Sequence, residues 1–255
     1  MNFPSPLIPT PTAIVLGASS GIGEALARRL AQEGYAVALV ARRADRLKKV
    51  CAEINSQQGS ARARSYPHDA TRFAEIPKLF QTILRDLGRL DVIVYASGVM
   101  PAVGLSEFNF EKDRAMIEVN VLGAMAWLDQ AAMLFERTGE GHIVGISSVA
   151  GDRGRVLNPV YNASKAALST YLEALRNRLT RKGVHVLTVK PGFVDTEMLK
   201  GVKRAFWVVS PDKLADEICK AIRRRKQSIY VPARWRWVML IVRHIPSFIF
   251  RRLSF

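Results

Sequence analysis

Short apolar segments alternate with segments of helical periodicity, and this alternation limits the possible folds of the chain more than any other feature. The first apolar segments are Ala13 to Leu16 and Ala36 to Ala41, and helical patterns over 21–33 and 44–58 follow them. Further apolar runs cover 92–96, 142–147 and 184–190, and further helical patterns cover 76–87, 110–135 and 160–181. Short apolar strands between helices are typical of a parallel sheet with helices on both faces. We predict an α/β fold, with one doubly wound domain and right-handed crossovers.

Length and composition fit one large domain between two shorter terminal segments. The 255 residues are 49% hydrophobic, which is enough for a sizeable core. We expect an irregular, proline-containing leader over 1–11 without a signal-peptide pattern, a domain over 12–232, and an amphipathic basic tail over 233–255. Cys51 and Cys219 lack disulfide or metal-site spacing, and the histidines show no metal-binding pattern. We therefore expect no metal and a reducing, cytoplasmic location.

A glycine-rich turn directly follows the first predicted strand. Gly17, Gly21 and Gly23 allow a tight turn and a close backbone approach, and the residues between them include Ser19, Ser20 and Ile22. The helix that follows offers unpaired N–H groups and a positive dipole end to a pyrophosphate. The spacing is G-x3-G-x-G rather than G-x-G-x-x-G, so the position after the first strand is what favours a dinucleotide site.

The end of the second predicted strand indicates which dinucleotide binds. An acidic residue there would bind the ribose 2′-hydroxyl of NAD, but this chain has Arg42 and Arg43. Guanidinium groups suit a 2′-phosphate. NADP(H) is therefore predicted over NAD(H), although two arginines at a helix start could also be only solvated.

A tyrosine and a lysine four residues apart, Tyr161 and Lys165, lie in the last long helical pattern, thirteen residues beyond Ser148. Residues at this spacing share a helix face, so the ammonium group can stabilise a phenolate. A phenol near such a charge becomes a usable acid or base near neutral pH. The same pair alone would be an ordinary amphipathic helix pair.

Several further motifs complete a resemblance to the short-chain dehydrogenases/reductases, over about 12–232. The matching pieces, in chain order, are the turn from Gly17 to Gly23, Asp69, Asn120, Ile146-Ser147-Ser148, Tyr161-x3-Lys165 and Pro191-Gly192-x-Val194-x-Thr196. Their order and number make the resemblance specific. It implies a Rossmann-type domain and an enzyme that interconverts a carbonyl and an alcohol with a nicotinamide cofactor.

The resemblance also implies roles for individual residues. Tyr161 would be the general acid of carbonyl reduction, Lys165 would lower its pKa and hold the nicotinamide ribose, and Ser148 would hydrogen-bond the substrate oxygen. Asn120 would position a water-linked proton relay, and Asp69 would contact the adenine. Pro191 and Gly192 belong to the motif in which Val194 and Thr196 would hold the carboxamide.

Two positions depart from the family pattern. The family usually has Asn-Asn-Ala-Gly after the fourth strand, where this chain has Tyr95-Ala96-Ser97-Gly98 and keeps only the glycine, and Leu16 stands where threonine is common. These changes put in doubt the hydrogen bonds that stabilise the loop and the adenosine-side contacts.

The C-terminal region concentrates the positive charge. No acidic residue follows Glu217, while ten lysines and arginines do, out of a net charge of +16. The longest uninterrupted apolar run, 237–242, is too short to span a bilayer, which needs about 20 residues. Tryptophans and arginines around short apolar patches suit the headgroup region of an anionic membrane, so residues 233–255 are predicted to attach peripherally to the inner membrane surface.

The sequence also allows other partners for the tail. It could pack across its own domain or against a second subunit, and the family often forms homo-oligomers. Nucleic-acid binding is not favoured, because no recognisable module accompanies the charge. The apolar segment between Glu197 and Val209 resembles a lid over substrate, which favours a lipophilic substrate. The functional alternative is a nucleotide-binding sensor or scaffold that associates through its basic tail.

Overall fold

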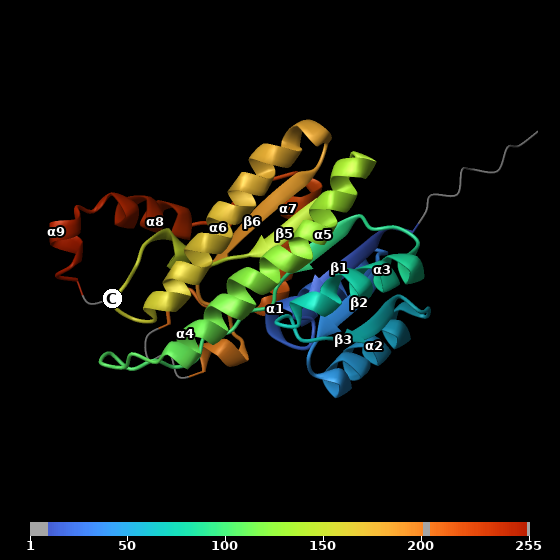
Figure 1. The fold of residues 1–255 in the computed structure, drawn as a ribbon, viewed down its shortest axis with the longest axis horizontal. Coiled ribbons are helices and arrows are strands. Elements are labelled where there is room, and N and C mark those ends of the chain that lie inside the picture. The colour runs from blue at the N-terminus through green and yellow to red at the C-terminus, as the bar shows by residue number, and fades with distance from the viewer. Residues whose placement is uncertain (1–9, 201–204, 254–255) are drawn as a thin grey trace, which may run out of the picture.

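A computed structural model of the chain describes residues 10–200 and 205–253. Its centre is a seven-stranded parallel sheet in the order β3-β2-β1-β4-β5-β6-β7 (Figure 1). The strands are β1 (Thr12–Leu16), β2 (Ala36–Ala41), β3 (Ala63–Pro67), β4 (Val92–Tyr95), β5 (His142–Ile146), β6 (His185–Pro191) and β7 (Ser228–Val231). The central strands form because their residues are apolar toward both faces of the sheet, and β1 is buried at every position.

Two layers of helices cover the sheet. One layer contains α1 (Gly21–Gln32), α2 (Ala44–Gln58) and α7 (Pro211–Arg223). The other contains α3 (Ile76–Leu87), α5 (Gly123–Thr138) and α6 (Pro159–Leu179), and α4 (Phe110–Ile117) precedes α5. Each layer buries its own core cluster against the sheet. The predicted fold class, a doubly wound Rossmann-type domain, is therefore confirmed.

The helix predicted over 110–135 is interrupted, and that prediction was wrong in this respect. A π-helical turn, Glu118–Leu122, separates α4 from α5 and contains Asn120. The Tyr95 hydroxyl donates to the Val119 carbonyl at 2.6 Å, and this bond occupies a carbonyl of the turn. Single π-helical turns often lie at functional sites. The two edge strands, β3 and β7, and the helix α7 were not among the predicted elements.

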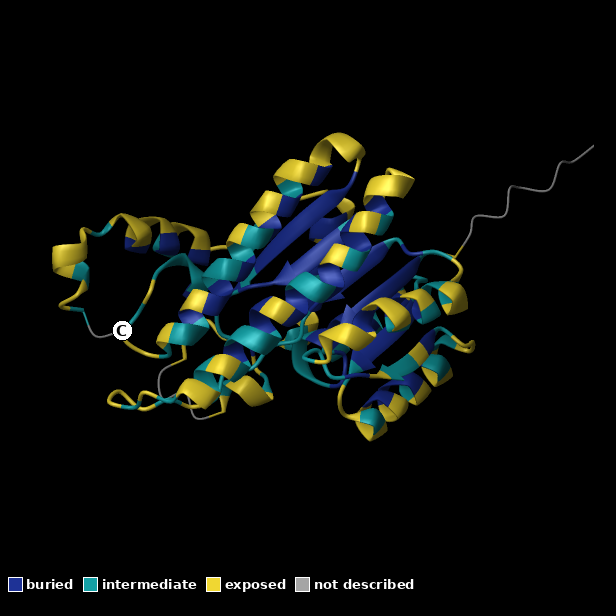
Figure 2. Cartoon of the chain, in the orientation of Figure 1, coloured by how far each residue is buried: buried dark blue, intermediate teal, exposed yellow. Residues whose placement is uncertain are grey.

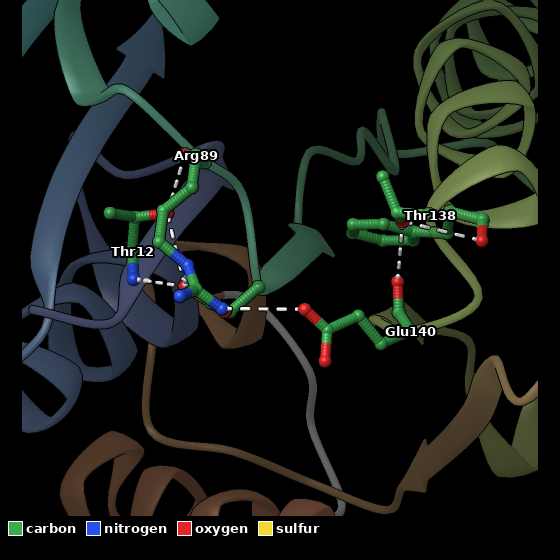
Figure 3. Close-up of polar contacts among 6 residues, drawn as sticks. Thr12, Arg89, Thr138 and Glu140 are labelled. Carbon is green, nitrogen blue, oxygen red and sulfur yellow. Dashed lines mark hydrogen bonds and ion pairs between the residues drawn. The ribbon is translucent and has the colours of Figure 1, made fainter. Parts of the chain in front are cut away.

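A polar cluster holds together the edge of the sheet where the strands begin (Figure 3). The Thr12 amide donates to Asp91 at 2.7 Å and its hydroxyl donates to the Arg89 carbonyl at 2.6 Å. Arg89 also lies 3.6 Å from Glu140, which accepts a bond from Thr138 through its carbonyl. These contacts tie β1 to the turn between α5 and β5, far from the edge where the strands end.

The tail forms two helices, α8 (Trp235–His244) and α9 (Ser247–Phe250), at the end of the molecule where the strands end (Figure 1). Buried and exposed residues alternate along α8 (Figure 2). Its inner face, Trp235, Met239 and Val242, packs in a small apolar cluster with Val149. Among the described residues, none of the helices is both long and apolar enough to cross a bilayer.

Candidate active site

The glycine-rich turn has the close backbone approaches that its sequence predicts. Gly17 has φ +80°, and a Cβ atom there would lie 2.7 Å from the Ser97 nitrogen. A Cβ atom on Gly23 would lie 2.3 Å from the Gly17 oxygen. Larger residues would separate the turn from the loop after β4 and from the start of α1. The turn therefore lies in the crevice where the strand order reverses, between β1 and β4, which is where open α/β sheets bind ligands.

The loop after β6 reaches the same turn. A Cβ atom on Gly21 would lie 3.0 Å from Cγ2 of Thr196. Val194 is buried and forms a parallel bridge with Val209, so the two ends of the segment between them are held together. Residues 201–204 of this predicted lid lie outside the described residues. Gly21, Thr196 and the Gly17 turn thus meet at one edge of the sheet, as their predicted roles require.

Arg43 lies over the serines of the turn. Its guanidinium group donates to the Ser19 hydroxyl at 3.0 Å and also to the Ser20 hydroxyl. It also lies 3.3 Å from Glu197, a carboxylate that Arg46 contacts at 3.0 Å. Hydrogen bonds from Arg46 and Arg43 lower the pKa of Glu197. The Ser19 and Ser20 hydroxyls and the Arg43 guanidinium group therefore lie together, and in this structure the Glu197 carboxylate is the anion beside them.

Arg42 points toward Asp69 instead, at 3.8 Å. Burial opposes ionisation of Asp69, but hydrogen bonds from Thr71 and the charge of Arg42 outweigh it and lower its pKa. Arg42 and Asp69 line a cavity of about 580 Å³ that also reaches Val99, Glu118 and the lid residue Met198. Asp69, the predicted adenine contact, and Arg42, predicted for the 2′-phosphate, therefore share one cavity with the lid residue Met198.

Tyr161 and Lys165 lie on the first turns of α6, as predicted. Lys165 is 4% exposed, its ammonium group donates to the Ile146 carbonyl at 2.9 Å, and it lies 5.8 Å from the centre of the Tyr161 ring. Burial lowers the pKa of Lys165 to about 8. A charge in this buried position is costly unless hydrogen bonds and nearby polar groups compensate it.

Ser148 lies beside Tyr161, where its hydroxyl acts to lower the pKa of the phenol, and it donates to the Pro191 carbonyl at 3.5 Å. The Ser148 oxygen also accepts from the Ala150 amide at 3.0 Å, which fixes the side chain at the start of a short 3-10 turn. Burial raises the pKa of Tyr161, while the Ser148 hydroxyl and the charge of Arg155 act in the opposite direction. The net shift is upward rather than the lowering expected from Lys165, because burial dominates in this structure.

Asn120 is fully buried and clamps the loop after β4 to α6. It accepts from the Val99 amide at 2.8 Å, and its amide group donates to the Val99 carbonyl at 3.0 Å and to Ser164 at 3.1 Å. A Cβ atom on Gly98 would lie 3.4 Å from the Asn120 oxygen and 3.5 Å from the Lys165 nitrogen. Gly98, Asn120 and Lys165 therefore meet in one place.

Tyr95 accounts for the departure from Asn-Asn-Ala-Gly. Its ring is fully buried and its hydroxyl bonds to the π-helical turn, with Gly123 directly beside it, where a Cβ atom would be 2.6 Å away. The loop thus loses the asparagine bonds but gains a bond that holds the turn carrying Asn120.

The sequence profile of the family described as short chain dehydrogenase matches residues 11–206, more than half of the chain. The chain belongs to the short-chain dehydrogenase/reductase family. It is an oxidoreductase that acts with NAD(P), and the family prediction is confirmed.

Relatives of this short-chain dehydrogenase/reductase include an uncharacterised oxidoreductase of Staphylococcus epidermidis, 33% identical over 74% of this chain and 80% of the relative. A short-chain dehydrogenase from Sphingobium yanoikuyae in complex with NADPH is 27% identical, covers 93% of this chain and 97% of its own, and superposes with a TM-score of 0.81. The structure of an actinorhodin polyketide ketoreductase with NADPH is 27% identical in sequence, covers 87% of this chain and 95% of its own, and superposes with a TM-score of 0.79.

Arg155, which was not singled out in the sequence, lies near enough to Tyr161 for the two to interact electrostatically. Its charge acts on Tyr161, and its Nε atom is buried with no hydrogen-bond partner among the described residues. Asn162 donates to the carbonyls of Arg155 and Leu157, at 3.4 and 3.0 Å, and so fixes the loop before α6. In the sequence, an arginine between glycine and valine looks like a solvated loop residue, so no local signal could have identified it.

The tail also contributes to the site. The Trp235 indole lies so close to Gly192 that a Cβ atom there would be 2.0 Å from its nitrogen. Trp235 also contacts lid residues Phe206 and Trp207, with ring centres 5.3 and 5.4 Å apart. The predicted alternative that the tail packs on its own domain therefore holds for the inner face of α8.

Proposed function

We propose that this short-chain dehydrogenase/reductase is an NADP(H)-dependent enzyme that interconverts a carbonyl and an alcohol on a lipophilic substrate, with Tyr161 as general acid and base. The observation that carries the proposal is the placement of Ser148, Tyr161 and buried Lys165 together, with the Lys165 ammonium group 5.8 Å from the centre of the Tyr161 ring, in the crevice that the Gly17 turn borders. Two of the solved structures that resemble the chain contain NADPH.

The described residues fit a dinucleotide with a 2′-phosphate. Gly17 and Gly23 leave no room for side chains where a pyrophosphate would approach the backbone, and α1 begins at Gly21. Arg43, held by Ser19 and Ser20, would hold the 2′-phosphate, with Arg42 and Asp69 on the adenine side. In the proposed assignment, Lys165 and Thr196 hold the nicotinamide end, together with Ile22, Pro191, Gly192 and Val194. When bound, the cofactor supplies or accepts the hydride.

The side chains of the site then provide the proton chemistry. In carbonyl reduction, Ser148 and Tyr161 donate hydrogen bonds to the substrate oxygen, where negative charge develops, and Tyr161 gives up its proton. The ammonium group of Lys165 stabilises the resulting phenolate. Asn120 holds the loop after β4 against α6, and Tyr161 is proposed to take up a new proton along a path beside it. In alcohol oxidation the same groups act in reverse, with Tyr161 as the base.

A lipophilic substrate is supported by an aromatic cluster at the lid, beside Gly192 of the site. Phe193, Phe206, Trp207 and Trp235 form an aromatic cluster between the loop after β6 and α8. Aromatic walls with a few placed polar groups are typical of sites for apolar ligands. We also propose that residues 233–255 contact an anionic membrane, that the enzyme works on the cytoplasmic side of it, and that the chain forms homo-oligomers.

The proposal is tested by NADPH and NADH oxidation with a series of carbonyl compounds of increasing apolar chain length, in wild type and in Arg43→Leu. We expect turnover with NADPH, a kcat/KM that rises with chain length, and a variant that loses NADPH preference while it still binds NADH. Equal use of both cofactors by the wild type would contradict the assignment of Arg43. Binding of NADPH without turnover of any carbonyl would favour the sensor or scaffold alternative.

A further inference from the structure

The loops around the site leave an unusual number of large apolar side chains exposed. In the loop between β4 and α4, Leu105 and Phe108 are 72% and 96% exposed, and Phe110, at the start of α4, is 73% exposed. On the lid, Phe206 and Val208 are about half exposed, and on the outer face of α8, Trp237 and Ile241 are 64% and 68% exposed. Large apolar patches exposed on the surface of a protein commonly mark interaction sites.

These segments emerge from one end of the molecule. Because all seven strands are parallel, the loops after β4, β6 and β7 leave the sheet at the same edge. The loop before α4 and the tail helices both extend from that end in Figure 1. Trp235 contacts Phe206 and Trp207, so the tail and the lid form a continuous surface. The active site opens at the same edge.

The outer face of α8 is presented by a fixed helix. Trp235, Met239 and Val242 anchor its inner face in the core. At its far end, Arg153 donates to the Val242 carbonyl at 2.7 Å and also to the Ile245 carbonyl. The Arg153 guanidinium lies 3.9 Å from the centre of the Phe250 ring. The loop that leads into Tyr161 thus holds the helix in place.

The charge at this end is positive and suits an anionic partner. Five exposed arginines surround the apolar residues of the tail, and no acidic residue follows Glu217; the arginines are Arg234, Arg236, Arg243, Arg251 and Arg252. Two acidic residues near the loop before α4 are paired, Glu107 with Lys112 at 2.6 Å and Glu111 with Arg114 at 2.7 Å. Arginines beside tryptophans and phenylalanines fit the headgroup layer of an anionic bilayer.

We propose that this end of the molecule docks as a unit on an anionic phospholipid bilayer, through the loop before α4, the lid residues Phe206 to Val208 and the outer face of α8 together, so that the active site opens onto the lipid. The substrate then reaches Tyr161 from the membrane rather than from water. The docking face extends the tail contact, and only the route of substrate entry rests on the proposed function.

The test is co-sedimentation of the full chain with vesicles of phosphatidylcholine, with and without about one-third phosphatidylglycerol. We expect binding to the anionic vesicles alone, weakened at high salt. Trp237→Glu, Ile241→Glu and Phe108→Glu should each reduce the bound fraction roughly fivefold or more. Met133→Glu is the matched control, because Met133 is 51% exposed near the end of α5, before the turn that leads to the beginning of β5. It should bind like the wild type.

Three results would overturn the inference. If the wild type does not sediment with anionic vesicles, the protein does not bind the membrane. If Phe108→Glu binds as fully as the wild type, the loop before α4 is not part of the docking face. A lipid-free dimer that Trp237→Glu converts to a monomer, measured by sedimentation velocity, would assign the face to a second copy of the chain.

Turnover of a short, water-soluble carbonyl separates this inference from the proposed function. The docking variants should keep that turnover and lose only turnover of a long-chain carbonyl presented in anionic vesicles. A protein that turns over neither compound but still binds the vesicles would contradict the proposed function and would still support the docking face.

Discussion

Arg155 places a second positive charge near Tyr161, on the loop that precedes the helix. That charge lowers the pKa of Tyr161 against the dominant upward effect of burial. Removing the charge therefore raises the pKa. In the proposed reaction, reduction needs the protonated phenol and oxidation needs the phenolate, so the pH profiles of both directions should move to higher pH.

We predict that Arg155→Gln oxidises alcohols more slowly than wild type near pH 7, and that the difference shrinks at high pH. The measurement is kcat/KM against pH in both directions. Arg155→Lys, which keeps a positive charge, should restore most of the wild-type profile. Unchanged profiles in Arg155→Gln would show that the guanidinium group acts only on loop structure.

Glu197 lies where the 2′-phosphate is proposed to bind, because it contacts both Arg43 and Arg46. We predict that Glu197→Gln binds NADPH roughly two- to fivefold more tightly, since exposed ion pairs of this kind are weak and the competing charge is removed. NADH binding should not change. Fluorescence titration measures both, with Glu217→Gln, which removes a carboxylate paired with Lys220 on α7, as the control. Equal gains for both cofactors would contradict the assignment.

One face of helix α8 packs against the folded domain, and its other face is exposed to solvent. Trp235 is 5% exposed and fits against Gly192, whereas Trp237 is 64% exposed. We predict that Trp235→Ala lowers the free energy of unfolding by about 3–5 kcal/mol, the usual cost of emptying such a position. Trp237→Ala should change it by less than about 0.5 kcal/mol. Urea denaturation of the full chain measures both, and equal effects would mean that α8 does not pack as described.

The paired strands β5 and β6 begin with two histidines whose Nδ1 atoms lie 2.9 Å apart. Burial, and then the charge of His185, lowers the pKa of His142 to about 4, below its usual value of 6.5. Below pH 6.5 the unfolded chain takes up a proton that the folded chain does not, so stability falls as the pH falls toward 4. After allowance for partial exposure, the loss is on the order of 1–3 kcal/mol.

We predict that His142→Gln shows a smaller loss of unfolding free energy between pH 7 and pH 4.5 than wild type. Urea denaturation at the two pH values gives the comparison. His244→Gln, which changes an exposed histidine at the end of α8, should keep the wild-type loss. A loss as large in His142→Gln as in wild type would show that other groups cause the acid sensitivity.

Much of the molecule as a whole could be predicted from its sequence, and the exceptions have physical causes. The central strands are apolar on both faces, so their pattern is clear, whereas the edge strand β7 buries only Val231 and has no such pattern. The π-helical turn depends on Tyr95, which contacts it from a distant strand, so the helical pattern over 110–135 continues through it. Tertiary contacts of this kind override local periodicity.

The candidate site shows the same division. Gly17, Ser148, Tyr161 and Lys165 were predicted because their chemistry depends on spacing along the chain, and the structure brings them to one edge of the sheet. Arg155 and Trp235 were not assigned to the site, because each reaches it only through folding. The packing of the tail could not be predicted either, since α8 carries large apolar side chains on its exposed face as well as on its buried face.

Tyr161 is proposed to carry the acid–base step of an NADPH-dependent reaction. The most direct test compares Tyr161→Phe with Tyr171→Phe, a tyrosine on the same helix whose hydroxyl bonds to Asp129 at 2.6 Å. NADPH binding and NADPH-dependent carbonyl turnover are measured in both. We predict that both variants bind NADPH like the wild type, that Tyr171→Phe keeps its turnover, and that Tyr161→Phe loses about 10²–10⁴-fold in kcat. A kcat of Tyr161→Phe close to that of wild type would contradict the account.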